Sequence, residues 1–329
     1  MSKITSSRDF QQIVQSLPEF ITADSLSYNS NKTQLFAYLK YYALPAYNNK
    51  NITLTIGKFK AFDFEVVVQA YQHINLSINN CNGIVVFVHG YFEHFGLYRD
   101  YINFLIDNNY LVIGYDLPGH GLSTGKAAHI VDFGQYAHSL EVLVDILKEK
   151  YKEFRVPFYL SAFSAGAAIG TEYLLRNRNN NFFNKVLWFA PLLRVPKWRY
   201  TELACWLLPI VKYVPRESVN ISHDSNFITF IKYNDPLQAK MVPLQWVNAL
   251  HHWVKRLPRH KPLDINLCII QGTEDRTIDW RYNIPNLARI FSYTQVHYIP
   301  DGYHSLCNES MLYQQLTFQY VKDFFKAQL

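Results

Sequence analysis

Three polar residues, Ser164, Asp275 and His304, each follow a short apolar run of the kind that forms a buried strand. Ser164 lies in the segment AFSAG, residues 162–166. This segment resembles the GxSxG nucleophile elbow, a sharp turn from a strand into a helix that presents a serine. A serine hydroxyl becomes an effective nucleophile when an adjacent imidazole takes its proton and a carboxylate orients that imidazole. The three residue types therefore predict nucleophilic acyl-transfer chemistry.

The order of these residues along the chain supports the same interpretation. Ser164, Asp275 and His304 follow the order serine, acid, histidine that is found in α/β-hydrolases. Asp279 and Asp301 are alternative candidates for the acid. Asp279 lies a helical turn beyond the end of the expected strand, and Asp301 lies only three residues before His304. We therefore favour Asp275 as the acid.

Acyl transfer also needs donors that stabilise the negative charge on the substrate oxygen. In proteins with this elbow, one donor is the N–H group after the nucleophile, and the other belongs to the loop after an early strand. Here these are the N–H groups of Ala165 and of Tyr91, which follows the apolar run Ile84–Val88. We interpret His89 as a hydrogen-bonding residue that orders this loop, and Asp116–Ser123 as a structural loop.

The elements that must position these residues are indicated by the spacing of apolar runs. Six short runs rich in β-branched and aromatic residues are expected to form strands buried on both faces. Helical stretches alternate with them, which predicts right-handed βαβ units and a mostly parallel sheet covered by helices. The expected strands are Ile84–Val88, Leu111–Tyr115, Phe158–Ala162, Val186–Phe189, Leu267–Ile270 and Val296–Ile299, and the expected helices are Tyr98–Asn108, Tyr136–Tyr151, Ala167–Arg176 and Asn308–Leu329.

Two further features precede this alternating region. Apolar residues in the first 50 positions follow helical spacing, so we expect a leading helix and an irregular arm there. The next two apolar runs predict an antiparallel hairpin with its turn at Lys60-Ala61. The apolar residues of the leading helix are Phe10, Ile13, Val14 and Leu17, and the hairpin strands are Ile52–Phe59 and Phe62–Gln72.

A segment without strands of this type, residues 194–261, interrupts the alternation. Helical patterning from Leu237 to Trp253 predicts a helical cap over the carboxyl ends of the strands, where open α/β folds bind ligands. The expected organisation is therefore an N-terminal helix and arm (1–50), an α/β core (51–193 and 262–329) and this cap.

Composition narrows the classes of function. The 329 residues include 49% hydrophobic and only 18% charged residues, so the chain is expected to be globular. Four widely spaced cysteines with no CxxC pair argue against a zinc site, a redox dithiol or a disulfide scaffold, and we expect no metal and no cofactor. No signal peptide or membrane-spanning segment is evident, so we expect a cytoplasmic protein. The net charge of +6 comes with no nucleic-acid-binding motif, so nucleic acid is not an expected partner.

The cap carries the excess charge of the chain and most of its tryptophan. It has eleven Lys and Arg against four Asp and Glu, a net charge of +7, and four of the six tryptophans. One interpretation is peripheral docking on the anionic inner face of a membrane, with tryptophan at the interface. The alternative is a solvated helix surface whose tryptophans pack down on the core. A comparison of anionic with neutral vesicles distinguishes the two.

Several motifs together resemble the lysophospholipase and monoacylglycerol lipase branch of the α/β-hydrolase superfamily, over residues 59–329. The resemblance implies a metal-free serine hydrolase that acts on an acyl ester of a lipid or lipid-like substrate. The chain departs from the family in Ala162, which replaces the first glycine of the elbow, and in the aromatic Tyr91 and Phe92. The motifs that carry the resemblance are HGYFEHFGLYRDY, YDLPGHGLSTG, AFSAG, GTEDRTI and GYHSLCNE.

This resemblance also implies roles for individual residues. Ser164 is the expected nucleophile, His304 the base and then the acid, and Asp275 the residue that orients the imidazole. The fold does not fix the substrate, so a thioesterase, an aminopeptidase and a non-catalytic binding protein on the same fold are alternatives. The residues expected to contact substrate are Tyr91, Phe92, Phe163, Trp198 and Trp206.

Overall fold

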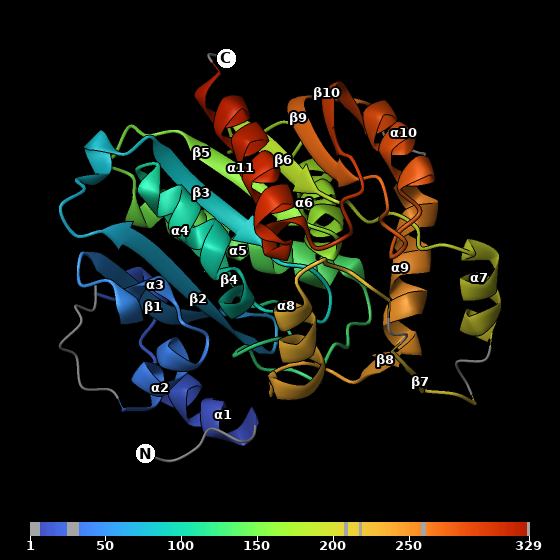
Figure 1. The fold of residues 1–329 in the computed structure, drawn as a ribbon, viewed down its shortest axis with the longest axis horizontal. Helices are drawn as coiled ribbons and strands as arrows, with labels where there is room; N and C mark the ends of the chain where they lie inside the picture. Colours follow the sequence, from blue (N-terminus) through green and yellow to red (C-terminus); the bar gives the residue numbers. More distant parts are fainter. Residues whose placement is uncertain (1–6, 25–32, 207–209, 217–218, 258–260, 328–329) are drawn as a thin grey trace.

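A central sheet of eight strands organises the computed structural model (Figure 1). The structure describes residues 7–24, 33–206, 210–216, 219–257 and 261–327. The strand order is β1-β2-β4-β3-β5-β6-β9-β10, and all pairs from β4 to β10 are parallel. The strands are β1 (Ile52–Ala61), β2 (Phe64–His73), β3 (Gly83–Val88), β4 (Tyr110–Tyr115), β5 (Phe158–Phe163), β6 (Lys185–Phe189), β9 (Leu263–Gly272) and β10 (Phe291–Ile299).

The mostly parallel α/β fold predicted from the apolar runs is confirmed. Every residue of β3, β4, β5 and β6 is buried, which explains why these segments show continuous apolar runs and no alternation. The hairpin is also present, but its turn lies at Phe62-Asp63 and not at Lys60-Ala61. Lys60 and Ala61 continue β1 and pair with β2, because Phe62 adopts the positive φ of 52° that closes the turn.

Helices cover both faces of the sheet. On one face, α4 (Arg99–Asp107) packs beside α11 (Met311–Lys326), where the rings of Phe104 and Phe318 stack 4.7 Å apart. On the other face, α5 (Phe133–Lys150) packs along α6 (Ala165–Arg176). A further helix, α10 (Trp280–Ile290), connects β9 to β10. This arrangement leaves the carboxyl ends of the parallel strands free of the covering helices.

The N-terminal arm packs against the sheet as a set of short helices. It comprises α1 (Ser7–Ser16), a 3-10 turn at Phe20–Thr22, α2 (Thr33–Tyr41) and α3 (Pro45–Asn48). The predicted leading helix is therefore present, and the apolar residues that predicted it are all buried. The arm lies beside the hairpin end of the sheet (Figure 1).

The segment between β6 and β9 contains short helices, as predicted, and also a small sheet. Two three-residue strands, β7 (Tyr213–Pro215) and β8 (Met241–Pro243), pair antiparallel within it. Its long helix α9 starts at Leu244, later than the helical pattern from Leu237 implies, because β8 and its Pro243 precede the first turn. The other helices are α7 (Trp198–Trp206) and α8 (Ser225–Thr229), followed by a wide turn at Phe230–Asn234.

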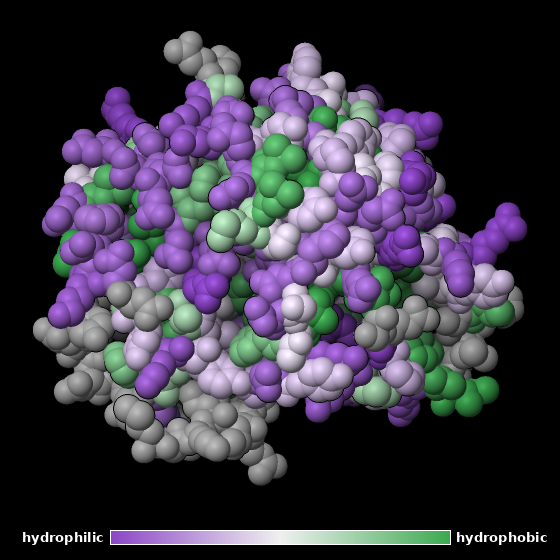
Figure 2. Space-filling view, in the orientation of Figure 1, coloured by the Kyte–Doolittle hydropathy of each residue, from purple (hydrophilic) through white to green (hydrophobic). Residues whose placement is uncertain are grey.

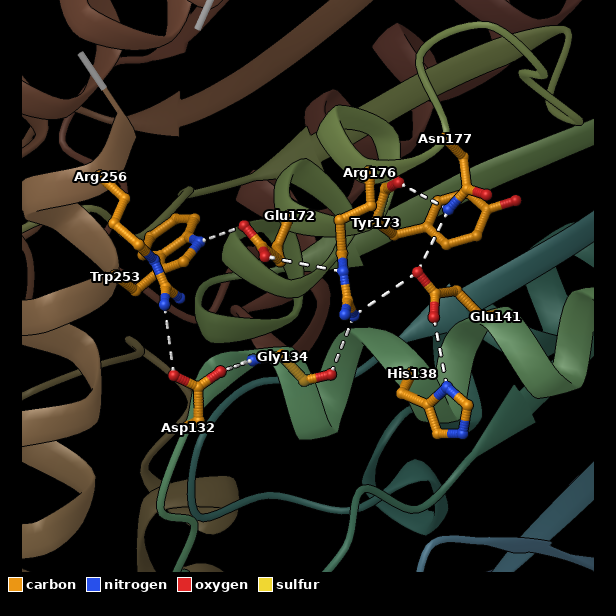
Figure 3. Close-up of polar contacts among 10 residues, drawn as sticks. All are labelled: Asp132, Gly134, His138, Glu141, Glu172, Tyr173, Arg176, Asn177, Trp253 and Arg256. Carbon is orange, nitrogen blue, oxygen red and sulfur yellow. Dashed lines mark hydrogen bonds and ion pairs between the residues drawn. The ribbon is translucent and has the colours of Figure 1, made fainter. Parts of the chain in front are cut away.

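Polar contacts fasten α9 to the core helices (Figure 3). The indole of Trp253 donates to Glu172 of α6 at 2.9 Å, and its ring stacks on Phe133 of α5. Arg256 lies 3.4 Å from the carboxylate of Asp132, which also caps the N-terminus of α5. Trp253 is fully buried, so this end of the cap is part of the folded core and packs down on it.

The remaining expectations from composition concern cysteines, metals and membrane spans. The four cysteines are free, and three of them are buried. Within the described ranges, no group of three or more His, Cys, Asp and Glu is arranged to hold a metal ion. None of the helices that the structure describes is long and apolar enough to cross a membrane.

Candidate active site

The structure brings Ser164, Asp275 and His304 together at the carboxyl ends of β5, β9 and β10. The Nε2 atom of His304 lies 3.0 Å from the Ser164 hydroxyl oxygen, and its Nδ1 atom lies 2.7 Å from the Asp275 carboxylate. All three residues are buried, with exposed fractions of 5 to 7%. The geometry is that of a serine, histidine and aspartate triad in which the carboxylate fixes the imidazole tautomer.

An unusual backbone conformation at Ser164 forms the sharp turn that presents its side chain to His304. Ser164 has φ 52° and ψ −112°, a conformation that L-residues rarely adopt, between β5 and the first residue of α6. Gly166 permits the close crossing, because a Cβ atom there would lie only 2.2 Å from the carbonyl oxygen of Val88. Ala162 is fully buried within β5, so its methyl group is accommodated without loss of the turn.

Asp275 is held by backbone donors at Oδ1 and by Gln271 at Oδ2, the oxygen that also contacts His304. The backbone N–H groups of Thr277 and Ile278 donate to Oδ1 at 2.8 and 3.3 Å, and Gln271 donates to Oδ2 at 3.0 Å. These donors hold the carboxylate in place. The alternative acids lie elsewhere: Asp279 caps α10, and the backbone of Asp301 bonds to Thr273. The geometry therefore favours Asp275 over both.

Of the two expected oxyanion donors, Ala165 directly follows Ser164, and Tyr91 lies in the loop after β3. Ala165 is the first residue of α6, where helix N–H groups have no partner inside the helix. Tyr91 occupies a turn closed by the Glu93 N–H donating to the Gly90 carbonyl at 3.3 Å. Neither the Ala165 nor the Tyr91 N–H donates to an acceptor within the described part of the chain. Both donors are thus free for a substrate oxygen.

His89 and the loop Asp116–Ser123 make the structural contacts expected of them. The Leu117 N–H donates to Nε2 of His89 at 2.9 Å, which ties the loop after β3 to the loop after β4. Burial lowers the pKa of His89 well below its ordinary value, so the ring is neutral and able to accept this bond. Asp116 accepts the N–H groups of Phe95 and Leu122. His89 is therefore a loop-ordering residue and not a second base.

The expected substrate-contacting residues are placed differently from one another. The Phe163 ring packs 4.8 Å from the His304 ring, beneath the triad. The Tyr91 ring turns toward the cap and stacks on Trp246 at 3.7 Å, while its hydroxyl donates to Ala128. Phe92 neighbours Tyr91, with ring centroids 4.1 Å apart.

The two remaining residues of that group lie on α7 of the cap. Trp198 stacks on His251 and lies over the Arg194 guanidinium, so its ring contacts other cap residues. The side chain of Trp206 lies outside the described part of the structure. The structure therefore places Phe163 against His304 and Phe92 beside Tyr91, whereas the ring of Trp198 contacts other cap residues.

Sequence reasoning assigned no role to Glu309, which fastens the loop that carries His304. The buried carboxylate accepts the backbone N–H groups of Tyr303, Ser310 and His223 at 2.8 to 3.0 Å. It also lies 3.0 Å from Nδ1 of His223, whose ring stacks on Tyr303 at 4.0 Å. His223 belongs to the cap, so this contact joins the cap to the histidine loop. The only sequence signal is the Asn-Glu pair in the GYHSLCNE motif.

A buried ion pair joins three distant parts of the chain above the loop that carries Tyr91. His94 lies 3.2 Å from the carboxylate of Asp235 in the cap, and both side chains are fully buried. Tyr42, from the N-terminal arm, donates to the other oxygen of Asp235 at 2.7 Å. Burial acts to lower the pKa of His94, but acidic groups led by the nearby Asp235 carboxylate together have the larger effect, so the pKa of His94 is raised. Burial acts to raise the pKa of Asp235, but the nearby His94 and the hydrogen bonds to the carboxylate together have the larger effect, so the pKa of Asp235 is lowered. The pair is therefore charged.

Replacing Asp235 by asparagine is expected to lower the free energy of unfolding by about 3 kcal/mol, because a buried charge loses its partner. The raised pKa of His94 contributes stability below about pH 6.5, and the lowered pKa of Asp235 contributes it above about pH 4. The difference between wild type and variant should thus be largest between these values and decrease as His94 loses its proton. Urea denaturation at several pH values measures this difference in the free energy of unfolding.

Asp145→Asn, which breaks an exposed pair with Lys148, is the control and should change stability by less than about 1 kcal/mol. Equal effects of the two variants would contradict this account.

Comparisons with known proteins agree with this geometry. The family model described as serine aminopeptidase, S33 (Hydrolase_4), matches residues 79–311. Phospholipase YtpA of Bacillus subtilis is 24% identical over 69% of this chain and 89% of its own length. Human monoglyceride lipase is 27% identical over 68% of this chain and 76% of its own length. The resemblance predicted from the motifs is thereby confirmed.

Solved structures show the same fold. A soluble variant of the Saccharomyces cerevisiae monoglyceride lipase, in complex with a substrate analogue, superimposes with a TM-score of 0.72. The alignment covers 82% of this chain and 94% of that one at 17% identity. Monoacylglycerol lipase from Paleococcus ferrophilus superimposes with a TM-score of 0.63 over 74% of this chain and 93% of that one, at 19% identity.

Proposed function

Because the chain belongs to the Hydrolase_4 family of α/β-hydrolases, we propose that it is a serine hydrolase that cleaves carboxylic esters of lipid-like substrates. The observation that carries this proposal is the hydrogen-bonded series from Asp275 through His304 to Ser164. The named relatives, which are monoglyceride lipases and a phospholipase, support an ester of a lipid as the substrate. No metal or cofactor enters the proposed reaction.

The proposed reaction has two halves. In the first, Ser164 Oγ attacks the acyl carbonyl carbon while Nε2 of His304 takes the hydroxyl proton, and the oxyanion accepts the N–H groups of Tyr91 and Ala165. His304 then gives this proton to the leaving alcohol oxygen, and an acyl-enzyme remains. In the second half, His304 takes a proton from water, the resulting hydroxide attacks the acyl carbon, and Ser164 leaves with the proton as the fatty acid is released.

An activity screen tests this proposal. We expect hydrolysis of monoacylglycerols, lysophospholipids and short p-nitrophenyl esters by the wild type. The family description names an aminopeptidase, so aminoacyl p-nitroanilides and acyl thioesters belong in the same screen. Turnover of the anilides alone would replace the ester assignment with an aminopeptidase. No turnover of any substrate would favour a binding protein that has kept the fold.

We further propose that the edge of the cap around α7 contacts an anionic lipid surface. This cap-edge patch combines exposed apolar side chains with exposed cations, and Figure 2 shows apolar side chains gathered below α7 at that edge. Trp246 and Trp253 do not contribute to this surface, because both side chains are buried. The patch consists of Lys197, Arg199, Tyr200, Leu203, Ile210 and Lys212.

Replacing both Leu203 and Ile210 by serine is expected to weaken binding to anionic vesicles by at least about tenfold, since each buried CH₂ contributes about 0.8 kcal/mol. Co-sedimentation with vesicles of phosphatidylglycerol and phosphatidylcholine measures it. Leu312→Ser, at an exposed apolar position on α11, is the matched control and should bind as the wild type does. Equal binding to purely zwitterionic vesicles, or no effect of the double change, would contradict this surface.

A further inference from the structure

The side chain of Arg216 lies directly over the loop that carries the proposed oxyanion donor. Arg216 follows β7 in the cap, and its guanidinium carbon is 4.5 Å from the centre of the Phe92 ring. Phe92 holds φ 69° at the third position of the Gly90–Glu93 turn, where glycine or asparagine is usual. A bulky residue in this conformation persists only where its surroundings stabilise it. The stacked guanidinium is one such contact.

Most of the hydrogen-bonding capacity of Arg216 is unused. Among the residues that the structure describes, its side chain donates once, from Nη1 to Oε1 of Gln238 at 2.6 Å, although a guanidinium carries five N–H donors. No carboxylate in the described ranges lies within 4.0 Å of it. The amide Nε2 of Gln238 is itself buried and without a partner within the same ranges. Two neighbouring side chains therefore present donors that lack acceptors.

The acidic groups near Arg216 are occupied by other partners. Asp235 forms the ion pair with His94 and accepts the Tyr42 hydroxyl. Glu93 accepts the hydroxyl of Tyr98, and burial raises the pKa of Glu93, which favours its uncharged form. Burial lowers the pKa of Arg216, but a guanidinium stays protonated in proteins. The positive charge of Arg216 thus remains available over Phe92, next to the Tyr91 donor.

We propose that Arg216 and Gln238 form a subsite for a phosphate group on the alcohol portion of the substrate. A guanidinium binds phosphate through two parallel N–H donors, and the adjacent amide supplies a third. This inference deepens the proposed function: among glycerol monoesters, it assigns a preference for those that carry a phosphate headgroup over neutral monoacylglycerols. It also disfavours a free α-ammonium group at this position, because two cations would repel.

The test compares two soluble substrates with the same short acyl chain, a monoacylglycerol and its phosphate monoester, each below its critical micelle concentration. The wild type should show the higher kcat/KM on the phosphate ester. In Arg216→Gln, the ratio of the two kcat/KM values should fall about 10- to 100-fold. Arg216→Lys retains the charge without the planar pair of donors and should give an intermediate ratio. Lys232→Gln removes the same charge from an exposed cap position outside the cap-edge patch and should keep the wild-type ratio.

Three results would overturn the subsite. A proportional loss on both substrates in Arg216→Gln would show that Arg216 only supports the loop. A ratio near one in the wild type would remove the preference itself. If inorganic phosphate inhibited the hydrolysis of both substrates while kcat/KM showed no preference for the phosphate ester, the ligand of Arg216 would be free phosphate and not a headgroup. Failure of the underlying function is distinguishable, because the wild type would then hydrolyse neither substrate, or Ser164→Ala would still hydrolyse both.

Discussion

Replacing Ser164 by alanine should lower kcat for ester hydrolysis by about 10⁵-fold while leaving the free energy of unfolding nearly unchanged. The change removes the nucleophile, and residues of a triad act as a unit, so the residual rate comes only from substrate binding and the oxyanion donors. Folding should tolerate the change because the serine side chain makes a single hydrogen bond within the described ranges, to His304. Alanine at φ 52° is no more strained than serine.

Steady-state kinetics on p-nitrophenyl butyrate and a monoacylglycerol measure this loss, and thermal unfolding confirms that the variant is folded. Ser222 provides a matched control, because it is also a buried serine but its hydroxyl donates to the Asn308 carbonyl and not to a triad residue. Ser222→Ala should keep kcat within a few-fold of the wild type. A Ser164→Ala protein with parental activity would contradict the assignment of the nucleophile.

Replacing Asp275 by asparagine should lower kcat by about 10⁴-fold, the second largest effect we expect. Two backbone N–H groups donate to Oδ1, so the asparagine oxygen must face them and its NH₂ group must face His304. The NH₂ group would then donate to Nδ1 and leave the proton on Nε2, which is the wrong tautomer for accepting the Ser164 proton. The NH₂ group of the asparagine would also face the NH₂ group of Gln271, which donates to Oδ2 in the wild type, so two donors would meet without an acceptor.

The pH dependence of kcat/KM of Asp275→Asn tests whether the loss comes from the wrong tautomer of His304. Thermal unfolding checks that the variant is folded. Asp279→Asn is the control, since Asp279 caps α10 and should affect stability but not the catalytic rate by more than a few-fold. If Asp279→Asn lost activity and Asp275→Asn kept it, the acid would have been misassigned. Activity that survives both changes would remove the acid from the proposed mechanism.

Local sequence patterns were sufficient to predict the core of the fold and the three triad positions. Strands buried on both faces require continuous apolar residues, so β3 to β6 are visible in the sequence itself. Because the carboxyl ends of parallel strands meet at one edge of the sheet, the elbow motif at Ser164 and the order of an acid and a histidine after two later strands predicted that Ser164, Asp275 and His304 would meet.

Contacts that depend on tertiary packing left no such pattern. Tyr42 and Asp235 are 193 residues apart, and nothing in either neighbourhood indicates that they bond. The rings of Tyr91 and Trp246 stack across two segments, so the direction of each ring is set by a partner that is distant in sequence. Arg216 contributed to the counted charge of the cap, but its place over Phe92 follows only from the folded chain. For the same reason, the excess of tryptophan in the cap did not reveal that Trp253 is buried.

Covalent labelling by a fluorophosphonate tests the central claim most directly, because it requires a nucleophile activated by its neighbours. After digestion and mass spectrometry, we expect one phosphonyl group per chain, on the peptide that contains Ser164, with labelling abolished in Ser164→Ala and strongly slowed in His304→Ala. Ester hydrolysis that persists while Ser164 stays unlabelled, or a label on another residue, would contradict the account.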